Sequence, residues 1–236
     1  MDALINGLSV FLPTYNEEGS IEKVIKDTAS AASKNVQKWE LIVVDDGSTD
    51  STNVIATQLA LSNPNIKVIR HEKNSGYGAS LKTGFYNAKY SWISFIDSDG
   101  QFDFGEIDKF IEKQKATGAD LVIGYYKKRK VSISKVITSK VWESLIFIFF
   151  GLKVHDIDCG FKLISKDVIN NIPKLESERG AFISSELLIK AKKKHFRFAE
   201  VPVTHYPRLR GQGTGRKLNV IIESFVDLFK LWIRLK

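Results

Sequence analysis

The sequence predicts an α/β protein with a mostly parallel central sheet flanked by helices. Two observations support this prediction. Short apolar runs alternate with helical stretches over residues 8–126, which is typical of β–α–β units joined by right-handed crossovers. Runs such as LIVV (41–44) and WISFI (92–96) are apolar without alternation, as expected for strands that are covered on both faces.

The elements of the first 126 residues can be assigned in order. Each expected strand is a short apolar run that ends at a polar or glycine-containing turn. Ser20 is expected to cap the first helix, and a glycine-rich turn is expected to open the third. The expected strands are 8–15, 39–48, 65–72, 90–99 and 119–126, and the expected helices are 20–33, 49–61, 75–89 and 104–117.

The pattern changes after Tyr126. A helix is expected within 132–151, a second around 184–194, a strand within 196–206, and a last helix over 218–236. The last helix carries one narrow polar stripe and is apolar over most of its remaining surface, so it is expected to be amphipathic. The stripe consists of Glu223, Asp227, Lys230 and Arg234.

Composition limits the class of protein. A chain of 236 residues with 43% hydrophobic residues suits one globular domain with a short appendage. Cys159 is the single cysteine, so no intrachain disulfide can form, and a reducing cytoplasmic setting is expected. We expect no signal peptide, because the first residues have no basic segment followed by a long apolar one. No apolar run approaches the roughly 20 residues of a membrane-spanning helix.

The net charge of +8 is unevenly distributed. Residues 127–153 contain seven Lys or Arg and one Glu, and residues 190–236 contain twelve Lys or Arg and three Asp or Glu. Both basic segments also contain apolar helical stretches. Such segments suit an anionic substrate or an anionic membrane surface, or they form solvated faces of helices that pack on the sheet. We expect no nucleic-acid partner, since no nucleic-acid-binding motif accompanies the charge.

Acidic or glycine-rich loops follow four consecutive expected strands: PTYNEE (13–18), DDGS (45–48), NSGYG (74–78) and DSDGQ (97–101). In a parallel α/β sheet, ligands bind at the carboxyl ends of the strands. Asp97 and Asp99, expected on one face of a strand end, would repel each other unless a cation lies between them. They could hold Mg²⁺ or Mn²⁺ together with a diphosphate, or they could form only a solvated acidic turn.

These motifs, in this order and spacing, resemble glycosyltransferase family 2, and more closely its dolichol-phosphate mannosyltransferase-like branch, the polyprenyl-phosphate glycosyltransferases. DIDCGFKLIS (156–165) and the segment from SSELL to RGQGT (184–214) extend the resemblance, which covers roughly residues 8–217. It implies a GT-A, Rossmann-like fold, a nucleoside-diphosphate sugar donor and a divalent metal. The resemblance divides the chain into a GT-A domain over 1–217, with a nucleotide-sugar half (1–126) and an acceptor half (127–217), and an amphipathic helix over 218–236.

The resemblance also implies roles for individual residues. The base and ribose would be held by Pro13, Tyr15, Glu17 and Asp45, supported by Asp46. Gly76 and Gly78 would let the backbone pass close to the nucleotide. Asp97, near the ribose, would join Asp99 and Gln101 at the metal, and the D-x-D-x-Q form is typical of the polyprenyl-phosphate branch. Arg208 and Arg210 would close over the diphosphate or the acceptor phosphate, since the planar guanidinium matches phosphate geometry.

This chain departs from the family where Cys159 replaces Ser or Thr and Ile157 replaces Pro. The branch often carries C-terminal transmembrane helices. We therefore expect either a separate membrane-spanning partner or contact with the membrane surface. In the second case Arg129, Lys130 and Lys135 would be placed for a lipid phosphate.

We accordingly expect an inverting, metal-dependent enzyme that moves a hexose, mannose or glucose, from a GDP- or UDP-linked donor to polyprenyl (dolichyl) phosphate. It would be cytoplasmic and peripheral on the inner membrane face. A phosphate acceptor needs no strong base, whereas a saccharide hydroxyl would need one, and Glu186 is the candidate, with Asp156 and Asp158 behind it. The rival interpretations are such a hydroxyl-directed transferase, a nucleotidyltransferase and a non-catalytic nucleotide-binding subunit.

Overall fold

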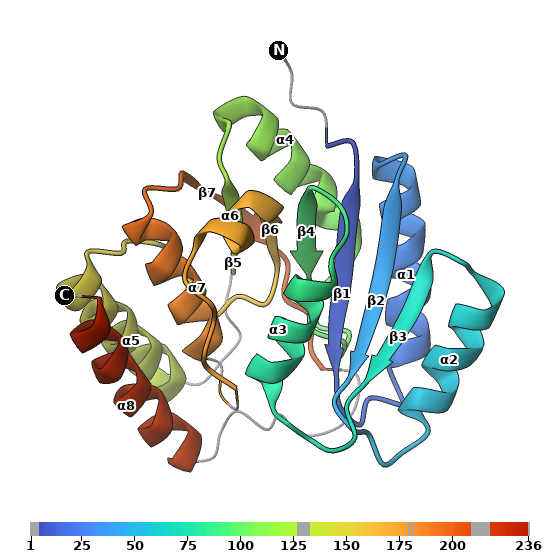
Figure 1. Ribbon diagram of the computed structural model, residues 1–236, viewed down its shortest axis with the longest axis horizontal. Helices are drawn as coiled ribbons and strands as arrows, with labels where there is room; N and C mark the ends of the chain where they lie inside the picture. The colour runs from blue at the N-terminus through green and yellow to red at the C-terminus, as the bar shows by residue number, and fades with distance from the viewer. Residues whose placement is uncertain (1–4, 127–132, 179, 181, 209–217, 236) are drawn as a thin grey trace.

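A computed structural model of the chain describes residues 5–126, 133–178, 180, 182–208 and 218–235. Its strands are β1 (Leu8–Thr14), β2 (Trp39–Asp45), β3 (Ile66–Arg70), β4 (Trp92–Phe95), β5 (Leu121–Tyr126), β6 (Lys162–Ser165) and β7 (Phe198–Val203). In the described part of the chain they form one sheet in the order β3-β2-β1-β4-β6-β5-β7 (Figure 1). Among the described strands, only β6 runs antiparallel to its neighbours, so the prediction of a mostly parallel sheet is confirmed.

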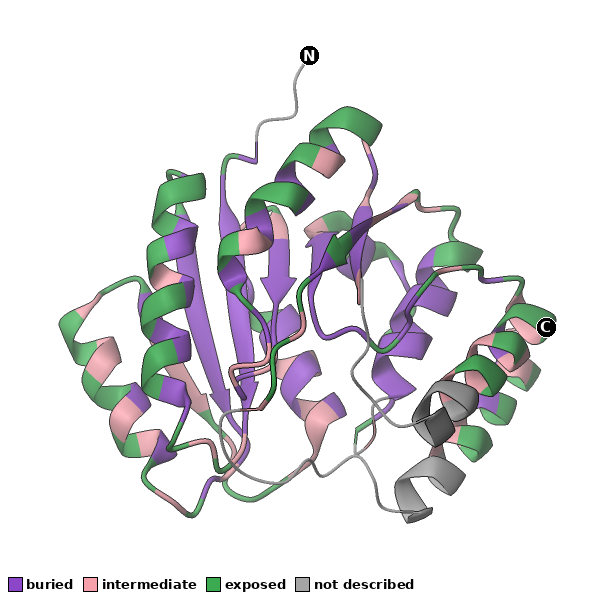
Figure 2. Cartoon of the chain, turned by 180° about the vertical axis from the view of Figure 1, so that it is seen from behind, coloured by how far each residue is buried: buried purple, intermediate pink, exposed green. Residues whose placement is uncertain are grey.

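Helices cover both faces of the sheet (Figure 1). The helices are α1 (Ile21–Asn35), α2 (Thr52–Ser62), α3 (Tyr77–Asn87), α4 (Ile107–Thr117, after a 3₁₀ turn at Phe104–Glu106), α5 (Ile133–Phe150), α6 (Lys166–Asn171), α7 (Phe182–Lys193) and α8 (Leu218–Arg234). Apolar side chains of α1, α2 and α4 form the core on one face, and those of α3, α6 and α7 form it on the other. Figure 2 shows the result, with buried strands between helices whose outer faces are exposed.

The strand pairing brings the functional loops to one edge of the sheet. All seven residues of β1 and of β2 are buried, and their register runs from Leu8 opposite Trp39 to Thr14 opposite Asp45. Asp45 lies opposite Arg70 at the end of β3. Because these strands are parallel and end together, the loops that follow them meet at this edge.

Two expectations about the strands were wrong. β4 ends at Phe95, not at residue 99, so Asp97 and Asp99 lie in a turn rather than on one face of a strand. β6 was not expected; it has four residues and follows α5 outside the alternating pattern. It fills the place between β4 and β5, where Lys162 pairs with Phe95 and with Ile123.

α5 and α8 lie side by side at the edge of the molecule (Figure 1). Trp142 contacts Phe225 with ring centroids 5.2 Å apart, and Phe149 contacts Trp232 at 5.4 Å. Leu228 and Leu231 of α8 are buried toward α7 and the core, so the helix packs on the domain. None of the helices in the described segments is both long enough and apolar enough to span a bilayer.

Candidate active site

The loops after β1 and β2 are joined by hydrogen bonds between their backbones and polar side chains. The Asn16 N–H donates to Ser48 Oγ (2.9 Å), and the Glu17 N–H donates to Thr52 Oγ1 (2.8 Å). Asn16 adopts a left-handed conformation (φ 53°), which Asn tolerates better than most residues, and its Oδ1 accepts from the Thr49 N–H (2.8 Å). The two loops therefore form one connected rim, in which Thr52 holds the Glu17 backbone.

The turn after β4 is tied to the same rim. Ser98 Oγ donates to the Pro13 carbonyl (2.9 Å), and Ser20 Oγ donates to the Ser98 carbonyl (2.9 Å). Ser20 stands before α1, as expected, but its hydroxyl makes no capping hydrogen bond to the helix. Ser20 instead positions the turn that carries Asp97 and Asp99.

Asp45 has one carboxylate oxygen that lacks a hydrogen bond. Its Oδ1 accepts from the Ser48 N–H (2.9 Å), whereas Oδ2 is buried, lies 3.4 Å from Arg70 Nε and forms no hydrogen bond. Burying a carboxylate oxygen without a hydrogen bond is costly, so a donor group of a ligand would stabilise it. This observation fits the predicted contact between Asp45 and the nucleotide.

Asp46 holds the glycine-rich loop in place. Its Oδ1 accepts from the Ser75 N–H (2.9 Å), and its Oδ2 accepts from the Gly76 N–H (2.8 Å). His71 Nδ1 lies 2.7 Å from Asp46 Oδ1, and His71 Nε2 lies 2.9 Å from Thr83 Oγ1. Asp46 thus connects the end of β2 to the start of α3, and its support of the nucleotide-holding residues stays a prediction.

Gly76 and Gly78 are required to be glycine for different structural reasons. Gly76 has a φ of 104°, a conformation that favours glycine. A Cβ on Gly78 would lie 2.6 Å from the Ser177 carbonyl oxygen and 2.7 Å from that of Glu178. Gly78 therefore has a packing reason to be glycine, and its expected role in admitting the nucleotide stays a prediction.

Asp97 and Asp99 are brought together by the turn after β4. Burial and the neighbouring Asp99 raise the pKa of Asp97 to about 6, and the positive charges of Lys162 and Arg208 oppose this. Tyr77 donates its hydroxyl hydrogen to Asp97 Oδ1 (2.9 Å). The turn thus concentrates negative charge at a partly buried site, which a divalent cation would stabilise.

Gln101 shares this turn. Its N–H donates to Asp99 Oδ1 (3.0 Å), and its Nε2 donates to the Tyr206 carbonyl (3.1 Å). Within the described residues, no three His, Cys, Asp or Glu side chains form a group that could hold a metal ion. Two carboxylates and one amide fit a cation that takes its remaining ligands from substrate phosphates, as Mg²⁺ usually does.

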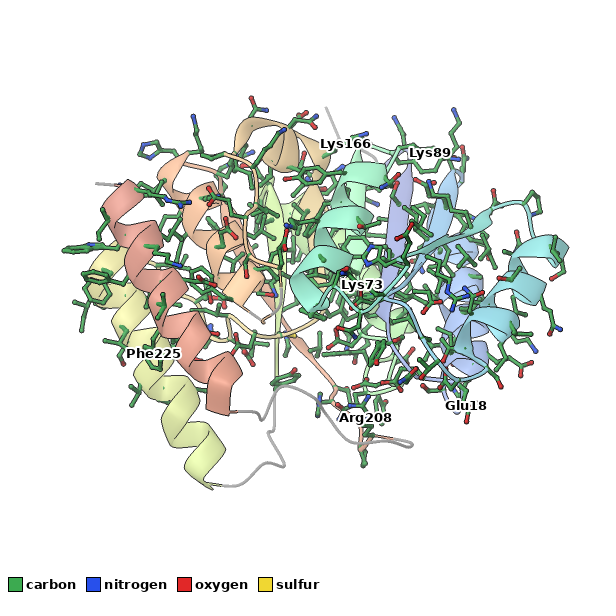
Figure 3. The ribbon with its side chains drawn as sticks, turned by 60° about the horizontal axis from the view of Figure 1, so that its bottom comes forward. Glu18, Lys73, Lys89, Lys166, Arg208 and Phe225 are labelled. Carbon is green, nitrogen blue, oxygen red and sulfur yellow. The ribbon has the colours of Figure 1, made fainter. Side chains whose placement is uncertain are left out.

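Arg208 reaches this acidic site from the other end of the chain. The segment after β7 is fixed by Thr204, whose N–H and hydroxyl both donate to Glu106 (2.9 Å each), and by the Tyr206 N–H, which donates to the Gln101 carbonyl (2.9 Å). The Arg208 guanidinium pairs with Glu17, and its Nη1 lies 3.7 Å from Asp99 Oδ2. Figure 3 shows Arg208 at the same end of the molecule as Glu18, away from Lys89 and Lys166.

Glu17 keeps a raised pKa despite this pairing, because burial outweighs the Arg208 charge. Tyr15 lies beside Glu17 in the same loop and is partly exposed. The structure therefore gathers nearly all of the predicted nucleotide and metal residues at one edge of the sheet. They are Pro13, Tyr15, Glu17, Asp45, Asp46, Gly76, Asp97, Asp99, Gln101 and Arg208.

Glu186 has a different environment from the one expected for a catalytic base. Its side chain is buried in α7 and accepts from the backbone N–H groups of Glu176 (2.9 Å) and Ser177 (3.0 Å). Lys190 Nζ lies 2.5 Å from Glu186 Oε1. The two backbone donors tie the 176–178 segment to α7, and this segment packs on Gly78.

The predicted acceptor residues are only partly described. Arg129, Lys130 and Arg210 lie outside the described residues. Lys135 lies in α5, but its side chain is not among those that the structure describes. Asp156 is buried in the loop before β6, where its Oδ1 accepts from the Asp158 N–H (3.1 Å). Cys159 is buried, and burial raises the pKa of its thiol to about 12, which agrees with a packing role rather than a nucleophile.

Sequence reasoning missed two residues behind Asp97. The motif NSGYG predicts a glycine-rich turn, and nothing in it marks Tyr77 as the hydrogen-bond partner of Asp97. Lys162 is fully buried in β6 and donates to the carbonyls of Ile157 (3.2 Å) and Cys159. Burial lowers the pKa of this amine.

Comparisons with known proteins agree with this geometry. The profile of "Glycosyl transferase family 2" matches residues 9–172. A dolichyl-phosphate beta-glucosyltransferase of Saccharomyces cerevisiae is 30% identical over 242 residues, covering 92% of this chain and 70% of that protein. A dodecaprenyl-phosphate galacturonate synthase of Rhizobium johnstonii is also 30% identical, over 94% of this chain and 66% of that protein.

The fold also matches solved structures. Glucosyl-3-phosphoglycerate synthase of Mycobacterium tuberculosis, solved with Mn²⁺, UDP and glucosyl-3-phosphoglycerate, superposes with a TM-score of 0.72 at 21% identity, covering 98% of this chain and 80% of that one. At this identity the likeness establishes the GT-A fold alone. With the profile match and the relatives above, the chain belongs to glycosyltransferase family 2, in its polyprenyl-phosphate glycosyltransferase branch.

Proposed function

We propose that this protein transfers a hexose from a nucleoside-diphosphate sugar to a polyprenyl phosphate, with inversion at the anomeric carbon. The observation that carries the proposal is the meeting of Asp97, Asp99 and Arg208 at the carboxyl edge of the sheet. Two carboxylates suit a divalent metal, and an arginine suits a phosphate. The dolichyl- and dodecaprenyl-phosphate enzymes among the relatives support the lipid-phosphate acceptor.

The donor would lie along the rim formed by the loops after β1, β2 and β4. The buried Asp45 Oδ2 without a hydrogen bond would accept from the base, and Glu17 and Tyr15 would flank the base and ribose. Asp97, Asp99 and Gln101 would hold Mg²⁺ or Mn²⁺ with the diphosphate. Such a cation stabilises the negative charge that builds up on the departing nucleoside diphosphate.

Arg208 would change partners when the donor binds. In this structure it pairs with Glu17 and lies near Asp99, where its charge offsets that of the carboxylates. A cation would take over that role, and the guanidinium could then turn to the diphosphate or the acceptor phosphate. Arg210, Arg129, Lys130 and Lys135 are further candidates for the acceptor phosphate.

The environment of Glu186 favours a phosphate acceptor, because this carboxylate is engaged and is not available as a base. A phosphate oxygen is already ionised at neutral pH, so it can attack the anomeric carbon without losing a proton to the enzyme. A single displacement of this kind inverts the configuration. Glu186 is engaged by three donors, which supports a structural role for it over general-base catalysis. A saccharide hydroxyl acceptor remains the second proposal, and it would require Glu186 or another carboxylate to be released.

The lipid would be reached at the face formed by α5 and α8. Exposed apolar side chains lie on both helices, and the basic segments 127–130 and 209–217 adjoin them in the sequence. Apolar side chains beside basic ones suit the interface of an anionic membrane. The exposed set is Val141, Phe147, Ile148, Phe225, Val226, Phe229 and Ile233. We propose peripheral binding to the cytoplasmic membrane face, alone or with a separate membrane-spanning partner.

The test is a transfer assay with an organic extraction. Purified protein is incubated with Mn²⁺ or Mg²⁺, a short polyprenyl phosphate, and radiolabelled GDP-mannose or UDP-glucose in separate tubes. We expect metal-dependent label in the organic phase with one donor, and loss of that label in Asp99→Ala. Full activity of Asp99→Ala in Mn²⁺ would contradict the proposed metal site. Release of inorganic diphosphate from a nucleoside triphosphate and a sugar phosphate would instead identify a nucleotidyltransferase.

A further inference from the structure

Tyr77 makes a hydrogen bond that joins two loops of the candidate active site. It is the first residue of α3, directly after Gly76, and its hydroxyl donates to Asp97 Oδ1 at 2.9 Å. The glycine loop belongs to the proposed nucleotide site, and Asp97 belongs to the proposed metal site. This side-chain contact therefore spans the two parts of the donor site.

The backbone on both sides of Tyr77 is held in place. Before it, Asp46 accepts from the Gly76 N–H (2.8 Å). After it, the Ala79 N–H donates to the Glu178 carbonyl (2.9 Å), and Gly78 is in close contact with the same segment. A side chain between two fixed points has little freedom, so the tyrosine hydroxyl is placed before any ligand arrives.

Asp97 is confined from the opposite side as well. A Cβ on Gly160 would lie only 2.6 Å from Asp97 Oδ2, so the 160 backbone packs directly against this carboxylate. Tyr77 therefore contacts one oxygen while the backbone limits the movement of the other. A partly buried carboxylate held this way has one main orientation, whereas a carboxylate on an open turn would have several.

We propose that Tyr77 is a positioning residue, whose hydroxyl orients the Asp97 carboxylate for the metal and links it to the nucleotide-binding glycine loop. This inference rests on the proposed function. Hydrogen-bond partners of metal-binding carboxylates are worth about 10- to 100-fold in metal affinity or activity. Loss of the hydroxyl should weaken metal binding by an amount in that range, and it should do so more strongly when nucleotide is present.

The alternative is that the hydroxyl only satisfies a buried polar group, with no effect on the metal. Tyr77→Phe separates the two, because it keeps the ring, which packs against the core, and removes only the oxygen. Tyr86→Phe is the matched control. Tyr86 lies on the same helix, and its hydroxyl accepts from the Leu175 N–H (3.1 Å), away from Asp97.

The experiment measures Mn²⁺ binding directly, through the electron paramagnetic resonance signal of free Mn²⁺. The whole protein is titrated alone, with UDP and with GDP, and its thermal unfolding is recorded without metal. We expect Tyr77→Phe to raise the Mn²⁺ dissociation constant about 10- to 100-fold with nucleotide, and Tyr86→Phe to leave it within about twofold. In an Asp97→Ala background, Tyr77→Phe should have no further effect, because the oxygen that accepts from the Tyr77 hydroxyl is gone.

The outcomes separate this inference from the proposed function. Wild-type protein that binds no Mn²⁺ with either nucleotide would overturn the proposed metal site itself. Wild-type binding with an unchanged constant in Tyr77→Phe would overturn the positioning role alone. An equal loss in Tyr77→Phe and Tyr86→Phe, or the same loss from Tyr77→Phe in the Asp97→Ala background, would also overturn it, since the effect would then not pass through Asp97.

Discussion

Replacing Asp46 with Asn should damage the glycine loop while leaving the rest of the sheet intact. The two carboxylate oxygens of Asp46 accept from the backbone N–H groups of Ser75 and Gly76, and His71 Nδ1 lies 2.7 Å from Oδ1. An asparagine has one oxygen, which can keep the Ser75 and His71 contacts. Its amide NH₂ would then face the Gly76 N–H, so that at least one hydrogen bond to a charged group is lost.

Such a hydrogen bond contributes about 1.5–3 kcal/mol. If this free energy is lost only from the nucleotide-bound state, it corresponds to roughly a 10- to 150-fold weaker nucleotide affinity. We would measure the binding of UDP and GDP by isothermal titration calorimetry in the presence of Mn²⁺. We expect the affinity of Asp46→Asn for the preferred nucleotide to fall within this range.

Asp120→Asn is the matched control for this prediction. Asp120 also accepts from a backbone N–H, that of Arg197 (2.8 Å), but it stands just before β5, at the opposite end of the sheet from the site. We expect it to lower the stability modestly and to leave nucleotide affinity unchanged. Wild-type affinity in Asp46→Asn, or an equal loss in Asp120→Asn, would refute the reasoning.

Three further predictions concern Asp97, Cys159 and α8. The pKa of Asp97 is about 6 in the folded state and about 4 in the unfolded state. The protonated carboxyl therefore stabilises the metal-free fold below pH 4, and this stabilisation is lost as the pH rises through 6. Asp97→Asn should therefore unfold at a higher temperature than the wild type at pH 8 without metal, and at a similar temperature near pH 4, as calorimetry would show. Cys159, buried with a thiol pKa of about 12, should react with a thiol reagent at pH 8 only after denaturation; rapid labelling of the native protein would contradict its burial. Phe229→Asp on α8 should weaken the binding to anionic phospholipid vesicles, measured by sedimentation, by about tenfold or more. Moving an exposed Phe side chain from water into the membrane contributes roughly 1.5–3 kcal/mol, and the substitution removes this contribution. Leu61→Asp on α2, where the side chain is 85% exposed, should not; equal effects would exclude the α5–α8 face as the membrane contact.

Much of the donor site follows from the sequence because parallel strands fix where their loops lie. β1 and β2 are fully buried parallel strands of the same length that pair residue by residue, so the motifs that follow them must meet. Asp45, Asp46, Asp97 and Asp99 were found for this reason. The resemblance to the family added Arg208, which is far from Glu17 in the sequence and pairs with it in the structure.

The remaining features depend on contacts that no local pattern reveals. β6 has four residues, which are too few to show the alternating pattern of a strand. Its place between β4 and β5 depends on the packing of the whole sheet. The 177–178 backbone, about a hundred residues later in the sequence, leaves no room for a side chain at Gly78. The sequence around Glu186 suggests an available acid near the start of a helix. In the structure, the backbone N–H groups of Glu176 and Ser177 both donate to its carboxylate. These are long-range consequences of the half of the chain that follows β5.

The most direct test of the central claim compares acceptors that differ only in the phosphate. Wild-type protein is given its donor, Mn²⁺ and either a polyprenyl phosphate or the matching polyprenol, and the lipid products are separated. We predict a labelled product with the polyprenyl phosphate and none with the polyprenol, because Glu186, the carboxylate expected to deprotonate a hydroxyl, is held by three donors. Equal transfer to the polyprenol, or transfer that requires the Glu186 carboxylate, would contradict the account.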